Sequence, residues 1–162
     1  MSSGDQLRPL YRAMVSLGVV GIVILALGLL DFFSFEPLGQ RTGMHATVQG
    51  VYHYDARSHE VSGQPRQRFT ADEAFAAVVD WSSLPGSTVV AARWFDTLGD
   101  DVGGVGPTSA AELASKSVIP VKIPQGFQHN VPGDYNFVVE RYSQGQPVEV
   151  LASRLVYVRA AV

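Results

Sequence analysis

The stretch Ala13–Leu30 most constrains this chain, because its eighteen residues include no charged side chain and no Asn, Gln or His. At about 1.5 Å per helical residue, the run covers roughly 27 Å, close to the hydrocarbon thickness of a bilayer. It predicts one membrane-spanning helix, which extends over residues 13–35 when the following Phe-rich segment is included. We therefore expect a tail at residues 1–12, a linker at 36–43 and a single exposed domain at 44–162.

The charges around this span predict its direction. Arg8 and Arg12 precede it, whereas Asp31 and Glu36 follow it before the next basic residue. Because Lys and Arg are retained on the cytoplasmic side, we expect a cytoplasmic N-terminus and an exported C-terminal domain. A cleaved signal peptide is the alternative, but the apolar run exceeds the usual length of about 7–15 residues and bulky side chains follow it.

Three glycines within the span, Gly18, Gly21 and Gly28, fall on one helical face. Small residues on such a face let another helix backbone approach, which indicates packing against integral membrane subunits within the lipid bilayer. The alternative is that Gly is simply common in membrane helices.

The overall composition narrows the function classes and the compartment. The formal net charge is −3 and there is no cysteine, so we expect neither nucleic-acid binding nor a disulfide or thiolate metal site. Arg is favoured over Lys, and Ala, Gly and Val are abundant, which favours a bacterial source. The predicted location is the bacterial inner membrane, with the domain in the periplasm.

After the linker, apolar residues alternate with a period of two, which is typical of strands. Three stripes are predicted to face inward: Phe75/Ala77/Val79, Val90/Ala92/Trp94 and Tyr135/Phe137/Val139. Strands are predicted at 44–54, 75–81, 88–95, 117–123, 135–142 and 148–158, and long loops at 57–68 and 96–115. One helical turn is expected within 108–114. Six or seven strands without an amphipathic helix predict an all-β antiparallel sandwich after the transmembrane helix.

The residues from Phe75 to Val158 resemble a bacterial immunoglobulin-like domain. The resemblance is carried by Trp94, by the run Pro132-Gly133-x-Tyr135-x-Phe137-x-Val139 and by the closing Leu155-Val156-Tyr157-Val158. In that family the Pro-Gly turn leads into the penultimate strand, whose aromatic residue packs near the Trp of an earlier strand. The resemblance implies an immunoglobulin-like β-sandwich with Trp94, Tyr135 and Phe137 in its core, and a role in binding proteins.

No catalytic motif is present. The Gly-Asp run after Phe95 departs from both calcium-loop and nucleotide-loop patterns, and G-x-S-x-G is absent. His45, His53 and His59 near Asp55 leave a metal or ligand carrier as a third hypothesis. We expect no enzyme activity, no cofactor and no metal.

The function expected from the sequence is therefore a non-catalytic, membrane-anchored accessory subunit. Its helix would pack against integral membrane subunits and its sandwich against an exported subunit, as in small accessory subunits of bacterial photosynthetic reaction centres or respiratory assemblies, which this architecture resembles. The alternative is a free-standing envelope binding module, such as an adhesin, an assembly factor or a ligand sensor. The candidate contact residues are Arg93, Phe95, Asp100, Asp101 and Val105.

Overall fold

The computed structural model describes residues 41–123 and 126–161, which belong to one compact unit. The predicted tail, the predicted transmembrane helix with Gly18, Gly21 and Gly28, and most of the predicted linker lie outside the described residues. Within the described ranges, no helix is both long enough and apolar enough to cross a membrane.

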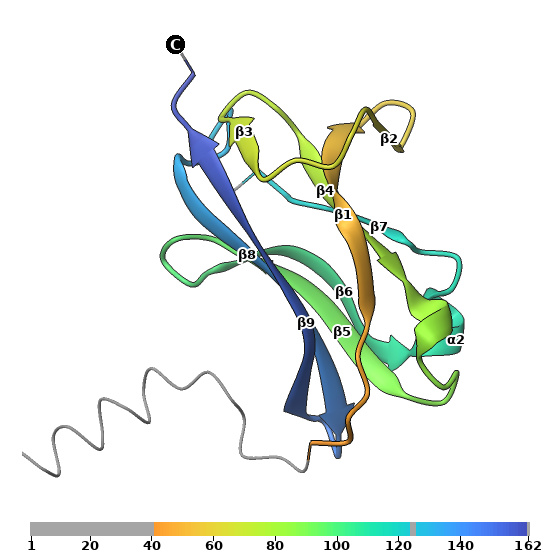
Figure 1. Cartoon of the computed structure of the whole chain (residues 1–162). Helices are drawn as coiled ribbons and strands as arrows, with labels where there is room; N and C mark the ends of the chain where they lie inside the picture. The colour runs from red at the N-terminus through yellow and green to blue at the C-terminus, as the bar shows by residue number, and fades with distance from the viewer. Residues whose placement is uncertain (1–40, 124–125, 162) are drawn as a thin grey trace, which may run out of the picture. The chain divides into compact units, whose positions relative to one another are not determined.

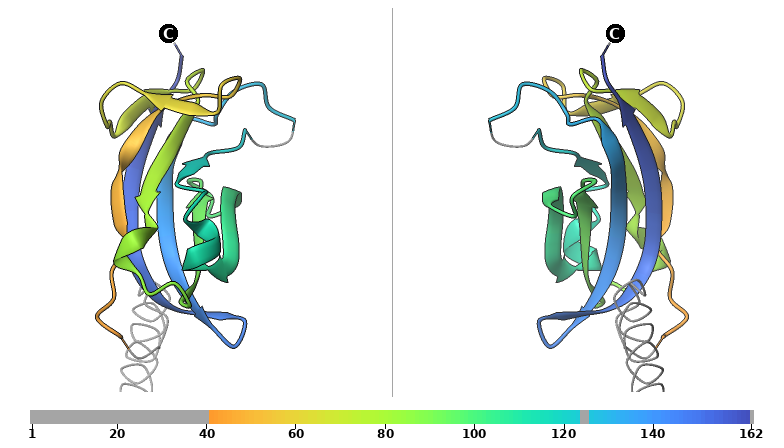
Figure 2. Two further views of the ribbon diagram at one scale, coloured as in Figure 1. Left: turned by 90° about the vertical axis from the view of Figure 1, so that its right-hand side faces the viewer. Right: turned by 90° about the vertical axis from the view of Figure 1, so that its left-hand side faces the viewer.

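The described domain is all-β and consists of two facing sheets (Figures 1 and 2). The four-stranded sheet has the order β2 (Glu60–Ser62), β1 (Thr47–Asp55), β4 (Phe75–Asp80), β7 (Val118–Pro120). The five-stranded sheet has the order β3 (Arg68–Thr70), β9 (Gln146–Arg159), β8 (Gly133–Ser143), β5 (Val89–Phe95), β6 (Asp101–Ser109). Two short helical segments complete the domain, the 3₁₀ turn η1 (Trp81–Ser83) and α2 (Ala110–Leu113).

The strands pair antiparallel, as expected, with one exception. β3 runs parallel to β9, with Phe69 opposite Val158, so the five-stranded sheet is mixed. The reason is that the chain leaves the four-stranded sheet after β2 and crosses to the other sheet before β3, instead of returning through a hairpin.

The three predicted stripes all lie in the core. Phe75, Trp94, Tyr135 and Phe137 are fully buried, as are the smaller members of each stripe. Aromatic rings connect the two sheets: the centroid of Phe75 lies 5.4 Å from that of Trp94, with the rings edge to face. The indole Nε1 of Trp94 also donates to the Ile119 carbonyl at 2.9 Å, which ties β5 to β7 across the sandwich.

The expectation of a long loop at 96–115 is wrong, because Asp101–Ser109 forms β6 along the edge of the five-stranded sheet. Its glycines are needed for this pairing. A side chain on Gly104 would overlap the Ala92 carbonyl, and one on Gly106 would lie 2.5 Å from the Val90 carbonyl oxygen. Two register shifts along β5 and β6 absorb the extra residues of β6 as bulges. The predicted helical turn is confirmed as α2, with Ser109 accepting from the Glu112 amide.

The expected loop at 57–68 is also interrupted. It contains β2 and the first residue of β3. With β6, these additions bring the described residues to nine strands rather than six or seven. Both β2 and β3 are only three residues long. They form by pairing with β1 and β9, which the alternation of their own residues does not predict. The predicted strand at 44–54 contains an irregularity, because the register of β1 against β4 shifts between Val48 and Gly50.

Candidate functional site

The outer face of the five-stranded sheet carries most of the contact residues expected from the sequence. Cross-strand register aligns its side chains in rows over β5, β8 and β9. One row is Phe95, Asn136 and Leu155, the next Arg93, Val138 and Ser153, and the third Ala91, Glu140 and Val150. Polar and apolar side chains therefore alternate across this face.

Large apolar side chains are exposed on this sheet. Of those exposed in the described part of the chain, Val89, Val150, Leu155 and Tyr157 belong to β5 and β9, with Tyr157 43% exposed. A solvated outer sheet face normally carries polar residues. Exposed apolar side chains on such a face are compatible with a contact surface.

Arg93 lies between acidic and aromatic groups on the same face. Its Nη1 is 3.9 Å from Oδ2 of Asp101, and its guanidinium carbon is 5.8 Å from the ring centroid of Tyr142. Partial burial raises the pKa of Glu140, and the charge of Arg93 offsets only part of this effect. Burial likewise raises the pKa of Tyr142, and the charge of Arg93 again offsets only part of this effect. We call Arg93, Asp101, Glu140 and Tyr142 the Arg93 cluster.

The structure brings only some of the expected contact residues together. Phe95 is half-buried on the outer face, and Asp101 is exposed beside it, as their register requires. Asp100 is exposed in the tight turn between β5 and β6, where its amide donates to Asp96. Val105 is opposite Ala92 and packs against the core, so its side chain lies on the inner side of the sheet.

A hollow of about 520 Å³ adjoins the edge strand β6. Its lining includes Arg93 and Asp101 of the Arg93 cluster, together with Lys122 and the glycines of β6. Asp96 also lines it, but its carboxylate accepts the amides of Leu98 and Asp100 and so holds the turn.

The histidines lie apart from this face. The Tyr54 hydroxyl is 2.9 Å from Nδ1 of His59 in the turn after β1, and His45 and His129 are exposed. Among residues 41–123 and 126–161, no group of three His, Asp or Glu side chains has the geometry of a metal site.

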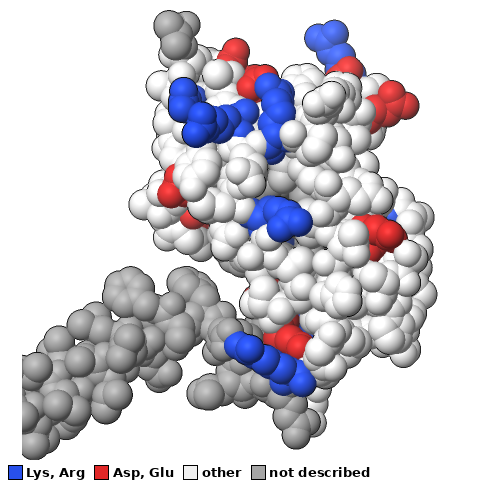
Figure 3. All heavy atoms as spheres, viewed as in Figure 1, with Lys and Arg blue, Asp and Glu red and all other residues white. Residues whose placement is uncertain are grey.

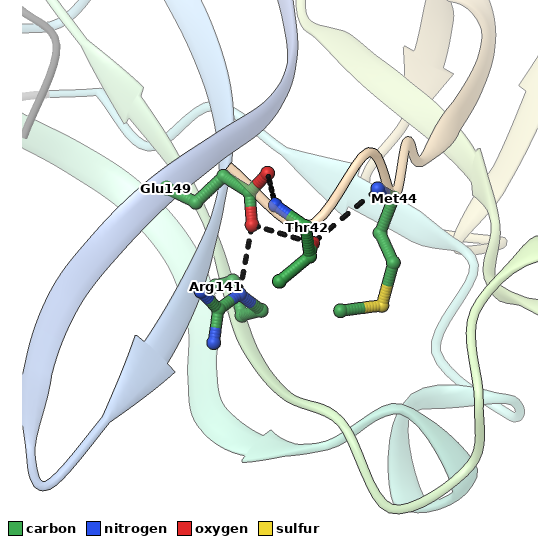
Figure 4. A network of polar contacts seen from close by, with 4 residues as sticks. All are labelled: Thr42, Met44, Arg141 and Glu149. Atoms are coloured by element: carbon green, nitrogen blue, oxygen red, sulfur yellow. Dashed lines mark hydrogen bonds and ion pairs between the residues drawn. The ribbon is translucent and has the colours of Figure 1, made fainter. Parts of the chain in front are cut away.

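A second site, not expected from the sequence, lies where the chain enters the domain (Figure 4). The nearly buried carboxylate of Glu149 accepts from the Thr42 amide at 2.8 Å, the Thr42 hydroxyl at 2.7 Å and Nε of Arg141 at 2.9 Å. Burial raises the pKa of Glu149, but these hydrogen bonds outweigh that effect and keep the pKa below its usual value. Thr42, within the predicted linker, is thereby fixed to the hairpin of β8 and β9.

Comparison of the chain with protein-family models and with curated proteins finds no match.

Proposed function

We propose that this protein is a non-catalytic accessory subunit of a bacterial membrane complex, held by an N-terminal transmembrane helix. The helix would pack against integral membrane subunits through Gly18, Gly21 and Gly28. The domain would dock on an exported subunit from the periplasmic side of the inner membrane. A photosynthetic reaction centre or a respiratory assembly is the kind of complex that fits this architecture.

The proposal includes an immunoglobulin-like fold for the sandwich. Two side-chain features support it. Trp94 is buried in a central strand, and the Tyr135 hydroxyl, at the start of the penultimate strand, donates to the Val131 carbonyl at 2.9 Å. Such a buried Trp and such a tyrosine corner are hallmarks of immunoglobulin domains.

The observation that carries the docking function is the outer face of the five-stranded sheet. Val150 and Tyr157 are exposed at one side of it, and half-buried Arg93 and Glu140 lie at its centre. A partner that covers this face would bury the apolar side chains and could complete the pairing of Arg93 and Glu140. The energy of such an interface comes from a few well-buried anchors rather than from its area.

The contact between Thr42 and Glu149 supports a bipartite attachment. Because the end of the linker is hydrogen-bonded to the domain, only a short segment separates the domain from the predicted membrane helix. A short tether raises the effective concentration of the domain at a partner in the same complex. Two weak contacts can then hold the subunit in place.

The test is gentle detergent extraction of native membranes, followed by size separation and mass spectrometry of the proteins that migrate with this chain. We expect a fixed-ratio set of integral membrane proteins. Val150→Lys should weaken this co-migration, because it places a charge where the partner would bury an apolar side chain. The domain itself should tolerate the lysine, because Glu140, the cross-strand neighbour of position 150, carries the opposite charge. Thr47→Lys, on an exposed position of the other sheet, is the matched control. Migration of the wild-type chain alone would refute the accessory-subunit proposal and favour a free-standing envelope binding module.

A further inference from the structure

An open slot lies beside β1 and β9, which are the front strands in the view of Figure 1. The slot has a volume of about 750 Å³. Its lining comes from three separate parts of the chain, namely residues 49–51 of β1, residues 65–68 before and within β3, and Arg154 and Leu155 of β9. Pro65 packs directly over Gly50, since a methyl group on Gly50 would lie 2.5 Å from Cβ of Pro65.

Three arginines, Arg66, Arg68 and Arg154, line this slot. Lys and Arg side chains gather over β3 and the adjoining half of β9 on this face (Figure 3). Arg66 is paired with Glu73 at 3.0 Å, and no other carboxylate of the described residues forms an ion pair in the slot. In a protein with a net charge of −3, this is a local excess of positive charge.

The same slot exposes a stretch of the β9 edge that has no partner strand among the described residues. The Leu151 carbonyl accepts from the Ala46 amide at one end, and the Tyr157 amide donates to the Gln67 carbonyl at the other. Alternate residues of a strand direct their backbone groups to the same edge, so Ser153 and Leu155 also face the slot. The open edge between the two bonds is roughly 20 Å long at about 3.3 Å per residue.

The Arg154 side chain lies along this edge. Its Nη1 donates to the Ser153 carbonyl at 3.4 Å, a long and weak contact that a better acceptor would replace. A carboxylate is such an acceptor, because it can take two parallel hydrogen bonds from one guanidinium.

We propose that this slot binds an acidic, extended segment of a partner protein, which adds to the free edge of β9 while its carboxylates pair with Arg68 and Arg154. The edge-facing backbone groups of Ser153 and Leu155 favour a peptide over a phosphate group, since only a peptide can continue the strand ladder. Pro65 and Leu155 are exposed and supply apolar contacts beside the arginines, so acidic residues alternating with apolar ones match the lining. The slot lies between the sheet edges and shares only Leu155 of its lining with the docking face proposed above.

The test uses the full chain in detergent micelles and a fluorescent peptide of about seven residues in which Glu and Val alternate. We expect this peptide to bind, and a peptide in which Gln replaces Glu to bind at least about tenfold more weakly. Binding should weaken when NaCl is raised from about 50 to about 500 mM. The double variant Arg68→Gln with Arg154→Gln should lose about tenfold in affinity, whereas Arg57→Gln, in the turn after β1, should not.

Hydrogen exchange distinguishes strand addition from charge attraction alone. The amides of Ser153 and Leu155 should become protected when the Glu-Val peptide binds. Equal binding of the Gln-Val peptide, unchanged binding by the double variant, or no protection at these amides would overturn the proposal. So would displacement of the peptide by a short-chain phosphatidylglycerol in an arginine-dependent manner, which would assign the slot to a lipid headgroup. None of these readouts depends on co-migration with a membrane complex, so the two proposals fail separately.

Discussion

Replacing Glu149 with glutamine should destabilise the domain, because three donors converge on its carboxylate. Two donors come from Thr42 and one from Arg141 (Figure 4), and the Arg141 and Glu149 side chains are only 17% and 8% exposed. An amide offers one acceptor oxygen, and its NH₂ group would face one of these donors. Hydrogen bonds to a charged group contribute about 1.5–3 kcal/mol each, and partial solvation of Thr42 reduces this, so we expect a loss of about 2 kcal/mol.

The assay is thermal unfolding at pH 7, where this loss should lower the Tm by roughly 5–10 °C. Because the pKa of Glu149 is lowered from the usual 4.5 in the folded state, its contribution is present above pH 4.5 and is lost as the pH falls below that value. The Tm difference between Glu149→Gln and wild type should therefore shrink toward pH 3. Glu60→Gln, on exposed β2, is the control. Equal Tm values for Glu149→Gln and wild type at pH 7, or an equal loss in Glu60→Gln, would refute the reasoning.

The remaining predictions concern the core, the edge strand and the docking face. Trp94→Phe should cost about 2–3 kcal/mol in the free energy of unfolding, measured with denaturant, because it removes the donor to Ile119 and part of a buried ring. Gly104→Ala should cost about 1–3 kcal/mol, because its methyl group overlaps β5, whereas Gly86→Ala, with its nearest contact at 3.4 Å, should change the free energy by less than about 0.5 kcal/mol. Equal effects of the two glycine variants would contradict the assignment of β6. Burial raises the pKa of Glu140, so the protonated side chain favours the folded state. This contribution is complete below the usual pKa of 4.5 and is lost as the pH rises through the raised pKa. Glu140→Gln should therefore raise the Tm at pH 7 by about 1–2 °C and leave it unchanged at pH 4; a lower Tm at pH 7 would contradict this sign.

The sheets and core were predictable where side chains alternate. Phe75, Trp94 and Tyr135 each belong to a stripe with a period of two, and each is fully buried. A strand of glycines carries no such signal. In β6 the glycines indicate a turn from the sequence, yet in the structure they permit close pairing with β5, which depends on a partner strand and not on local pattern.

The polar sites were less predictable because they depend on irregular pairing and on distant residues. A register shift between Val139 and Glu140 changes the alternation along β9, and Glu149 lies beyond it, next to Thr42. The arginine slot joins Arg68 to Arg154, which are far apart in the sequence. The alternation around Trp94 is sufficient to predict that Arg93 and Phe95 lie on the outer face of β5.

Site-specific crosslinking in native membranes tests the central claim most directly. A photoreactive phenylalanine derivative would replace Val150 or Tyr157 on the outer face of the five-stranded sheet, or Thr47 on the other sheet, and mass spectrometry would identify the crosslinked protein. The docking proposal predicts that both outer-face positions capture the same exported or membrane-bound subunit and that position 47 does not. Capture from position 47 alone, or no specific product from either outer-face position, would contradict it.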